Sequence, residues 1–284
     1  MPGRSAKLPF IGIYDTISKI MSIKSLSIHP KLAAVIDLLF GVAFLVFLDN
    51  VFAAWFLGVM VSVRFLVWMV IVRLSYYPAS LKRFWHLMSL LVFHLGATLL
   101  LLFIEWGFSW TLVAAVYVAF PFVSFWLLPS KSQNFLSFVQ KPYRRWRFWI
   151  TTFGLYGIWT ATFASISLQI LNISYWWLLI GGAIFTAVVS MWWWKEYGIE
   201  MKNKFWWWVI AIGIFLVEIS WVLYLWPLGY FVSALLVVWL WYDIWLMGRF
   251  YLLPAGINWK KQISFFISNG LLLLVFLILI VKWK

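Results

Sequence analysis

Long hydrophobic runs, each close to the length needed to cross a bilayer, follow one another along almost the whole chain. A helix rises about 1.5 Å per residue, so roughly 20 apolar residues cross a hydrocarbon core about 30 Å thick. The pattern predicts an all-α integral membrane protein, a multi-pass bundle of about nine transmembrane helices. The predicted spans are 32–48, 51–72, 85–104, 110–128, 148–171, 175–194, 205–225, 228–247 and 265–281.

The first and last of these segments leave an eight-span arrangement open. The segment 32–48 is one of the two shortest and contains Asp37, so it could lie flat on the membrane. The last segment is followed by Lys282 and Lys284, and re-entry of this segment would return both lysines to the side where the other charges lie.

Positive charge lies in alternate connections between the hydrophobic runs, and this distribution predicts the orientation of the chain. The connections 49–50, 105–109, 172–174 and 226–227 contain neither Lys nor Arg. Nineteen of the 22 Lys and Arg residues lie in the N-terminal segment and in the other connections. Because cytoplasmic loops carry an excess of Lys and Arg, the N-terminus is predicted to be cytoplasmic. Trp residues cluster at the predicted span ends, as they do in the aromatic belts of membrane proteins.

Two parts of unequal size follow from this pattern. Residues 1–31 form a basic segment in which apolar residues recur at roughly helical spacing, which predicts an amphipathic helix at the membrane interface or a disordered tail. Residues 32–284 form a polytopic transmembrane domain of four helical hairpins and a final span. The spans use almost all of the chain, so no separate soluble domain is predicted.

Composition narrows the possible functions. Hydrophobic residues make up 65% of the chain and charged residues 11%, which is typical of a membrane protein rather than of a soluble one. The net charge of +14 is explained by the cytoplasmic loops, so nucleic-acid binding is not predicted. There are no cysteines and three histidines without metal-ligand spacing, so neither a metal site nor a cofactor is predicted. The absence of a catalytic motif disfavours an enzyme.

Ionisable residues inside the predicted spans are the first candidates for function, because the bilayer makes them costly unless they are paired or hydrated. Asp37 and Arg64 lie on adjacent antiparallel spans at similar depth, which predicts an ion pair. The larger hypothesis is an intramembrane polar cluster that lines a cavity open to the cytoplasm. Its candidate members are Asp37, Arg64, His94, Asp243 and Glu218.

A basic and aromatic stretch precedes the fifth predicted span. Basic residues next to interfacial aromatic residues attract anionic lipid head groups. The candidate contacts with anionic lipid are Lys141, Arg144, Arg145 and Arg147, although the same charges also act as a topology signal.

Three classes of function remain open from the sequence. The first is a small permease or lipid-handling transporter, the second a non-catalytic membrane subunit or assembly factor, and the third an intramembrane enzyme that modifies a lipid. The expected partners are the lipid bilayer, with anionic head groups at its cytoplasmic face, and a membrane protein. The expected location is the cell membrane, as a multi-pass protein of a prokaryotic cytoplasmic membrane.

Overall fold

The computed structural model describes residues 28–48, 54–75, 83–105, 107–128, 140–171, 173–254 and 256–280. Almost all of the predicted interfacial segment therefore lies outside the described residues. Within them the chain forms nine α-helices. Their bounds are α2 Pro30–Leu48, α3 Ala54–Leu74, α4 Arg83–Phe103, α5 Gly107–Trp126, α6 Gln140–Ser167, α7 Tyr175–Glu196, α8 Asn203–Leu225, α9 Tyr230–Leu252 and α10 Trp259–Ile280.

The predicted fold class, an all-α multi-pass membrane bundle, is confirmed. Eight of the described helices are long and apolar enough to cross a membrane, and α6 is the exception. The α6 helix packs against four other helices, α4, α5, α7 and α9. Its Thr151, Gly154, Gly157 and Thr160 residues are buried against neighbouring helices rather than facing lipid, so α6 does not need a continuously apolar surface.

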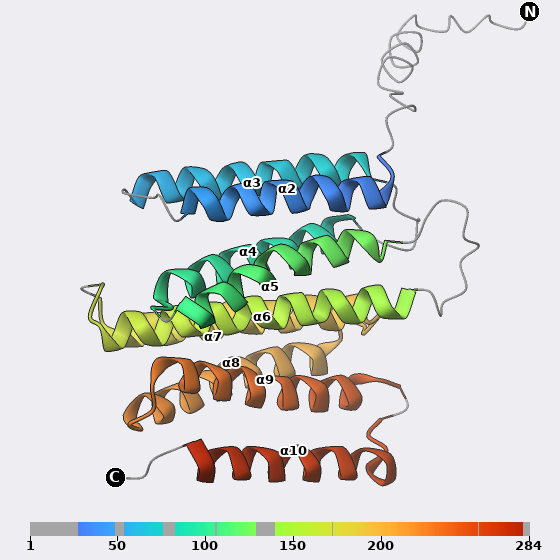
Figure 1. Cartoon of the computed structure of the whole chain (residues 1–284). Coiled ribbons are helices and arrows are strands. Elements are labelled where there is room, and N and C mark those ends of the chain that lie inside the picture. The colour runs from blue at the N-terminus through green and yellow to red at the C-terminus, as the bar shows by residue number, and fades with distance from the viewer. Residues whose placement is uncertain are drawn as a thin grey trace, which may run out of the picture.

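The direction of the helices alternates along the chain, as Figure 1 shows. Phe93 of α4 packs against Phe153 of α6, and these two helices run parallel. Trp85 of α4 packs against Trp192 of α7, which runs antiparallel to both. The N-terminal ends of the even-numbered helices thus gather at one end of the bundle, together with the C-terminal ends of the odd-numbered helices. We call this the basic end, because the described Arg and Lys residues of the connections, such as Arg83, Lys195 and Arg249, lie there.

The predicted spans agree with the observed helices at most boundaries. The largest difference is α6, which begins at Gln140, eight residues before the predicted span. Those additional residues are polar and basic, so the helix continues beyond the hydrocarbon layer, where hydrophobicity no longer marks it. The same reasoning applies to α10, which begins six residues early at Trp259.

Three glycines bring α4 and α6 into backbone contact. A Cβ atom placed on Gly154 would lie 2.5 Å from the Val92 carbonyl oxygen and 2.7 Å from Phe93 Cα. A Cβ atom on Gly96 or on Gly157 would collide with the facing backbone in the same way. Small residues of this kind allow membrane helices to approach closely, and we call this contact the glycine seam.

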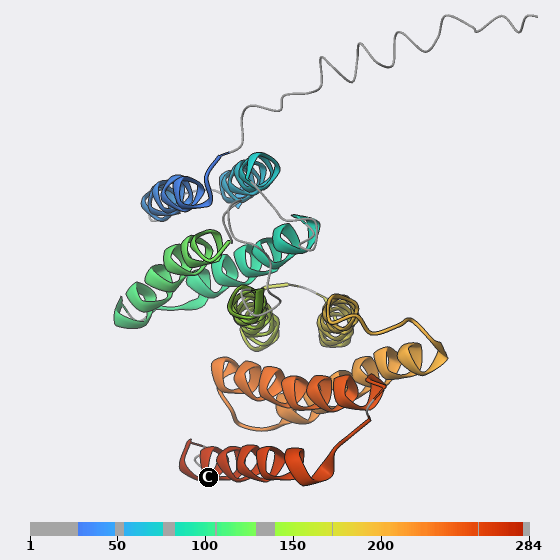
Figure 2. The same cartoon turned by 90° about the vertical axis from the view of Figure 1, so that its right-hand side faces the viewer.

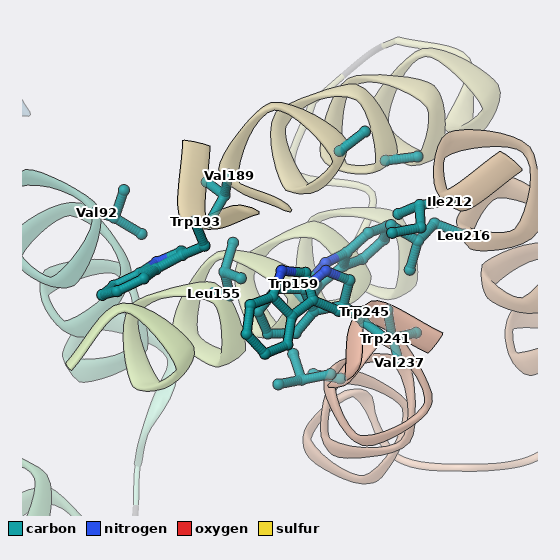
Figure 3. Close-up of a cluster of buried hydrophobic side chains, with 14 of the residues drawn as sticks. Val92, Leu155, Trp159, Val189, Trp193, Ile212, Leu216, Val237, Trp241 and Trp245 are labelled. Atoms are coloured by element: carbon teal, nitrogen blue, oxygen red, sulfur yellow. The ribbon is translucent and has the colours of Figure 1, made fainter. Parts of the chain in front are cut away.

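Tryptophan fills the core between α6, α7, α8 and α9, as Figure 3 shows. Trp159 donates a hydrogen bond to Thr186 Oγ1 (3.0 Å), and Trp241 donates one to Ser190 Oγ (2.7 Å). Trp193 lies at the basic end, as predicted for an aromatic belt, but its side chain is completely buried against other helices. Sequence position gives the depth of a Trp residue in the membrane, whereas the rotation of its helix decides whether it faces lipid or protein.

The last helix, α10, lies on the outer side of α9 in both Figure 1 and Figure 2. None of the residues in its membrane-spanning window is buried. Asn269 on α10 donates a hydrogen bond to Asp243 on α9, and the rings of Trp239 and Phe276 pack nearby. The α10 helix is therefore the most loosely attached of the described helices.

Candidate functional site

The five predicted intramembrane residues do not form one cluster. Asp37, Arg64 and His94 come together between α2, α3, α4 and α5. Asp243 lies on α9 beside α10, where it accepts the hydrogen bond from Asn269. Glu218 is exposed on the outer face of α8. The hypothesis of a single polar cavity is therefore wrong for Asp243 and Glu218, because their helices point them away from the other three.

The predicted ion pair between Asp37 and Arg64 is present. Arg64 Nη2 lies 3.6 Å from Asp37 Oδ1, and both side chains are buried. The Trp68 indole N–H donates a hydrogen bond to the same carboxylate oxygen. Gly41 makes room for the guanidinium, since a Cβ atom at that position would lie 3.0 Å from Arg64 Nη2.

Aromatic rings surround the Arg64 guanidinium and supply most of its contacts. Its central carbon lies 4.3 Å from the centre of the Tyr117 ring, 4.9 Å from that of Trp68 and 5.7 Å from that of Phe44. Such rings stabilise a cation that has been removed from water. The Arg64 cation thus faces one carboxylate and three aromatic rings.

His94 completes this buried centre through hydrogen bonds at both ring nitrogens. Its Nε2 donates to the Val61 carbonyl oxygen (3.2 Å), and its Nδ1 accepts from the Tyr117 hydroxyl (2.8 Å). Both nitrogens are therefore engaged. Among the described residues, no group of three His, Asp or Glu side chains could hold a metal ion. The centre joins four helices, which is a structural role for these polar residues.

Arg147 requires a correction, because it does not lie at the lipid surface. Its guanidinium is buried and forms a bidentate salt bridge with Glu196, with N–O distances of 2.7 and 2.8 Å. Its Nε and Nη2 atoms also donate to Ser89 Oγ, both at 3.3 Å. Arg147 therefore ties α6 to α7 and α4, and it is not available to a lipid head group.

The other members of the basic stretch are placed differently. Lys141 and Arg145 are exposed at the start of α6. The Arg144 guanidinium lies 4.6 Å from the centre of the Tyr197 ring, and that of Arg249, from the end of α9, lies 3.8 Å from the same ring. One tyrosine thus holds two arginines together at the basic end, with Arg145 close by.

Arg145, Tyr197 and Arg249 border a cavity of about 740 Å³ between α6, α9 and α10. Its lining runs along α9 from Leu235 to Arg249, which corresponds to about 21 Å of helix. Arg145, Arg249 and Tyr197 lie at one end, and Thr152 and Asn269 are the polar residues further along. The remaining lining residues are apolar or aromatic and include Phe148, Trp149, Leu235, Val238, Trp239, Tyr242, Trp245, Leu246 and Phe265.

A second cavity of about 810 Å³ lies among the connections at the basic end and is lined in part by Glu200, Lys202 and Lys204. Lys202 Nζ is 2.6 Å from Glu200 Oε2. The hydrogen bond and charge of Lys202 lower the pKa of the Glu200 carboxyl, so this carboxylate is charged at neutral pH and offsets the lysine. The second cavity is therefore less suited to an anion than the first.

Sequence reasoning missed Tyr197 and the role of Arg249. Arg249 follows Asp243 by six residues on α9, but Asp243 bonds to Asn269 instead. Aromatic residues beside arginines in the connections at the basic end are the signal that points to such a site. The signal does not reveal that connections distant in sequence meet at one ring.

No protein-family model, no curated protein and no solved structure matches the chain.

Proposed function

We propose that this chain is a lipid-handling membrane protein that binds an anionic amphiphile in the cavity between α6, α9 and α10. The observation that carries the proposal is the polarity of this cavity, with arginines at one end and apolar and aromatic walls along the rest. The head group would lie at Arg145 and Arg249, and the hydrocarbon portion between α9 and α10.

The charges at the end of the cavity support an anionic head group. Within the described part of the chain, no carboxylate forms an ion pair with Arg144, Arg145 or Arg249. The nearby Glu196 is already paired with Arg147. Guanidinium groups bind carboxylate and phosphate oxygens through parallel hydrogen bonds, so this group of arginines favours an anionic head group.

Position in the membrane supports a lipid rather than a water-soluble solute. By the positive-inside rule the basic end faces the cytoplasm, so the arginines stand at the level of the cytoplasmic head groups. The cavity then extends past the middle of α9, into the hydrocarbon layer. A ligand that fits both regions is amphiphilic.

The attachment of α10 supports handling of the lipid rather than permanent storage. The α10 helix has no buried residue in its spanning window and makes one hydrogen bond to α9. A small displacement of α10 would open the cavity sideways to the bilayer. Such a route lets a lipid enter and leave without crossing the bundle.

The test compares lipid retention by purified protein in nanodiscs of mixed anionic and zwitterionic phospholipid. Native mass spectrometry would count bound lipids in the wild type and in an Arg145→Gln, Arg249→Gln variant. Lys195→Gln is the matched control, because Lys195 is exposed at the same end but does not line the cavity. We expect the double variant to lose a bound anionic lipid that the control retains.

A second variant tests the hydrocarbon portion of the site. Leu235→Trp would fill the far end of the cavity without changing any charge. We expect this variant to lose the same lipid. Equal lipid retention by all of these proteins would mean that the arginines bind only the general lipid surface, and the proposal would be abandoned.

A further inference from the structure

Glu218 occupies an unusual position, exposed on α8 in the middle of the membrane-spanning part of the chain. It lies four residues from Ile214, the central residue of α8, which corresponds to about 6 Å along the helix axis. No hydrogen bond or ion pair of Glu218 occurs within the described residues. A carboxyl group that faces hydrocarbon is costly unless another group hydrogen-bonds to it.

The exposed residues around Glu218 follow a regular pattern. Among the exposed residues of α8, those in line with Glu218 recur at alternating intervals of four and three residues, which is the spacing of two helices that pack side by side along their length. Trp207, Ile214 and Leu225 are 71%, 55% and 63% exposed. We call this surface the α8 row, and its members are Trp207, Ala211, Ile214, Glu218, Trp221 and Leu225.

The neighbouring helix carries a glycine at the depth of the carboxyl group. Trp176 on α7 packs against Trp221 on α8, and Ala187 lies 3.8 Å from the Cβ position of Gly213. This register places Gly181 of α7 at the same depth as Glu218. Gly181 is exposed, and a Cβ atom there would meet nothing within 4 Å.

We infer that the α8 row is the interface of a homodimer, in which the Glu218 carboxyl groups of two copies hydrogen-bond to each other. A two-fold axis along the membrane normal sets residues of equal depth against one another. The only ionisable residue in the row therefore meets its own copy. Two carboxyl groups can hydrogen-bond to each other without a cation between them, and the row contains no cation.

This inference is independent of the proposed function, because the α8 row does not line the cavity between α6, α9 and α10. It also bears on the membrane-subunit class of function, in which a polar residue on an apolar face marks a helix contact. A heteromeric partner would have to present a donor or a cation at the depth of Glu218. A second copy meets that requirement with the chain's own residues.

The absence of cysteine makes a direct test possible. Purified single-cysteine variants would be reconstituted at low protein-to-lipid ratio and treated with a bismaleimide cross-linker. Ile214→Cys places the thiol in the middle of the α8 row. Leu39→Cys is the matched control, because Leu39 is 63% exposed near the middle of α2. We expect a cross-linked dimer from Ile214→Cys and none from Leu39→Cys.

Substitutions of Glu218 in the Ile214→Cys background test the carboxyl pair. Glu218→Gln should preserve the dimer, since an amide both donates and accepts. Glu218→Leu should lower the association constant roughly 3-fold to 30-fold, the range for one or two hydrogen bonds between membrane helices. Leucine at a lipid-facing position is compatible with the folded monomer, so a loss of dimer would report the interface.

Several results would overturn the inference. Equal cross-linking of Ile214→Cys and Leu39→Cys would indicate random collision. Unchanged association of Glu218→Leu would remove the carboxyl pair from the interface. Cross-linking of Ile214→Cys only to a different protein in native membranes, with no dimer of the purified chain, would assign the α8 row to a heteromeric partner.

Discussion

Replacing Gly154 with alanine should force α4 and α6 apart and destabilise the bundle. The added Cβ atom would lie 2.5 Å from the Val92 carbonyl oxygen, whereas ordinary contact begins at 3.4 Å. The helices would therefore have to separate by about 0.9 Å at this level. Both contacting groups are backbone atoms of rigid helices, so no side chain can rotate to relieve the collision.

The energetic cost follows from two opposing effects. Overpacking of a close contact costs about 1–3 kcal/mol. Alanine is favoured over glycine within a helix by about 1 kcal/mol. Separation of the helices would also lengthen the hydrogen bonds from Arg147 to Ser89, which are 3.3 Å long in the intact protein. We expect Gly154→Ala to be about 1–3 kcal/mol less stable than a variant that receives the helix preference alone, because that preference is common to both variants.

Gly181→Ala is that variant, because a Cβ atom at Gly181 meets nothing within 4 Å. The assay is equilibrium unfolding in mixed micelles, followed by tryptophan fluorescence and circular dichroism. Gly181→Ala should match or exceed the stability of the wild type, and Gly154→Ala should fall below it. If both variants have the same free energy of unfolding, α4 and α6 do not form the close contact described above.

Two further substitutions test the buried ion pairs by the same assay. Asp37→Asn leaves the Arg64 cation buried without its carboxylate and should lower the free energy of unfolding by about 3–5 kcal/mol. An added Arg64→Met substitution should restore most of this loss, and a double variant no more stable than Asp37→Asn would contradict this account. Arg147→Gln breaks the bidentate contact with Glu196 and should lower the free energy of unfolding by about 3 kcal/mol. Arg145→Gln, at an exposed position, should change it by about 0.5 kcal/mol or less. Similar effects of the two substitutions would place Arg147 at the surface.

The spans could be predicted from the sequence because bilayer thickness fixes how long an apolar helix must be. The Asp37 and Arg64 pair could be predicted as well, since consecutive antiparallel helices joined by a short turn place equal depths side by side. Both inferences use only distance along the chain and depth in the membrane. Both quantities can be estimated from a single sequence.

The remaining contacts depend on how each helix is rotated about its axis and on which distant helices meet. Arg147 was assigned to lipid because its neighbours in the sequence are basic, but one face of α6 turns it toward Glu196 on α7. Arg249 and Arg144 meet at Tyr197 although they come from different helices. Helices that are apolar on nearly every side give no periodic signal from which their rotation could be read.

The glycine seam joins two helices that are not consecutive in the chain, and this sets an order for biogenesis. Gly96 and Gly154 are separated by 58 residues, which a ribosome adds in about 3 to 12 s at ordinary rates. During that interval α4 stands in the membrane with its glycine face turned to lipid or to the translocation machinery. The bundle therefore cannot close until α6, the least apolar of its helices, has been inserted. Assembly of the helices before and after α6 depends on that step.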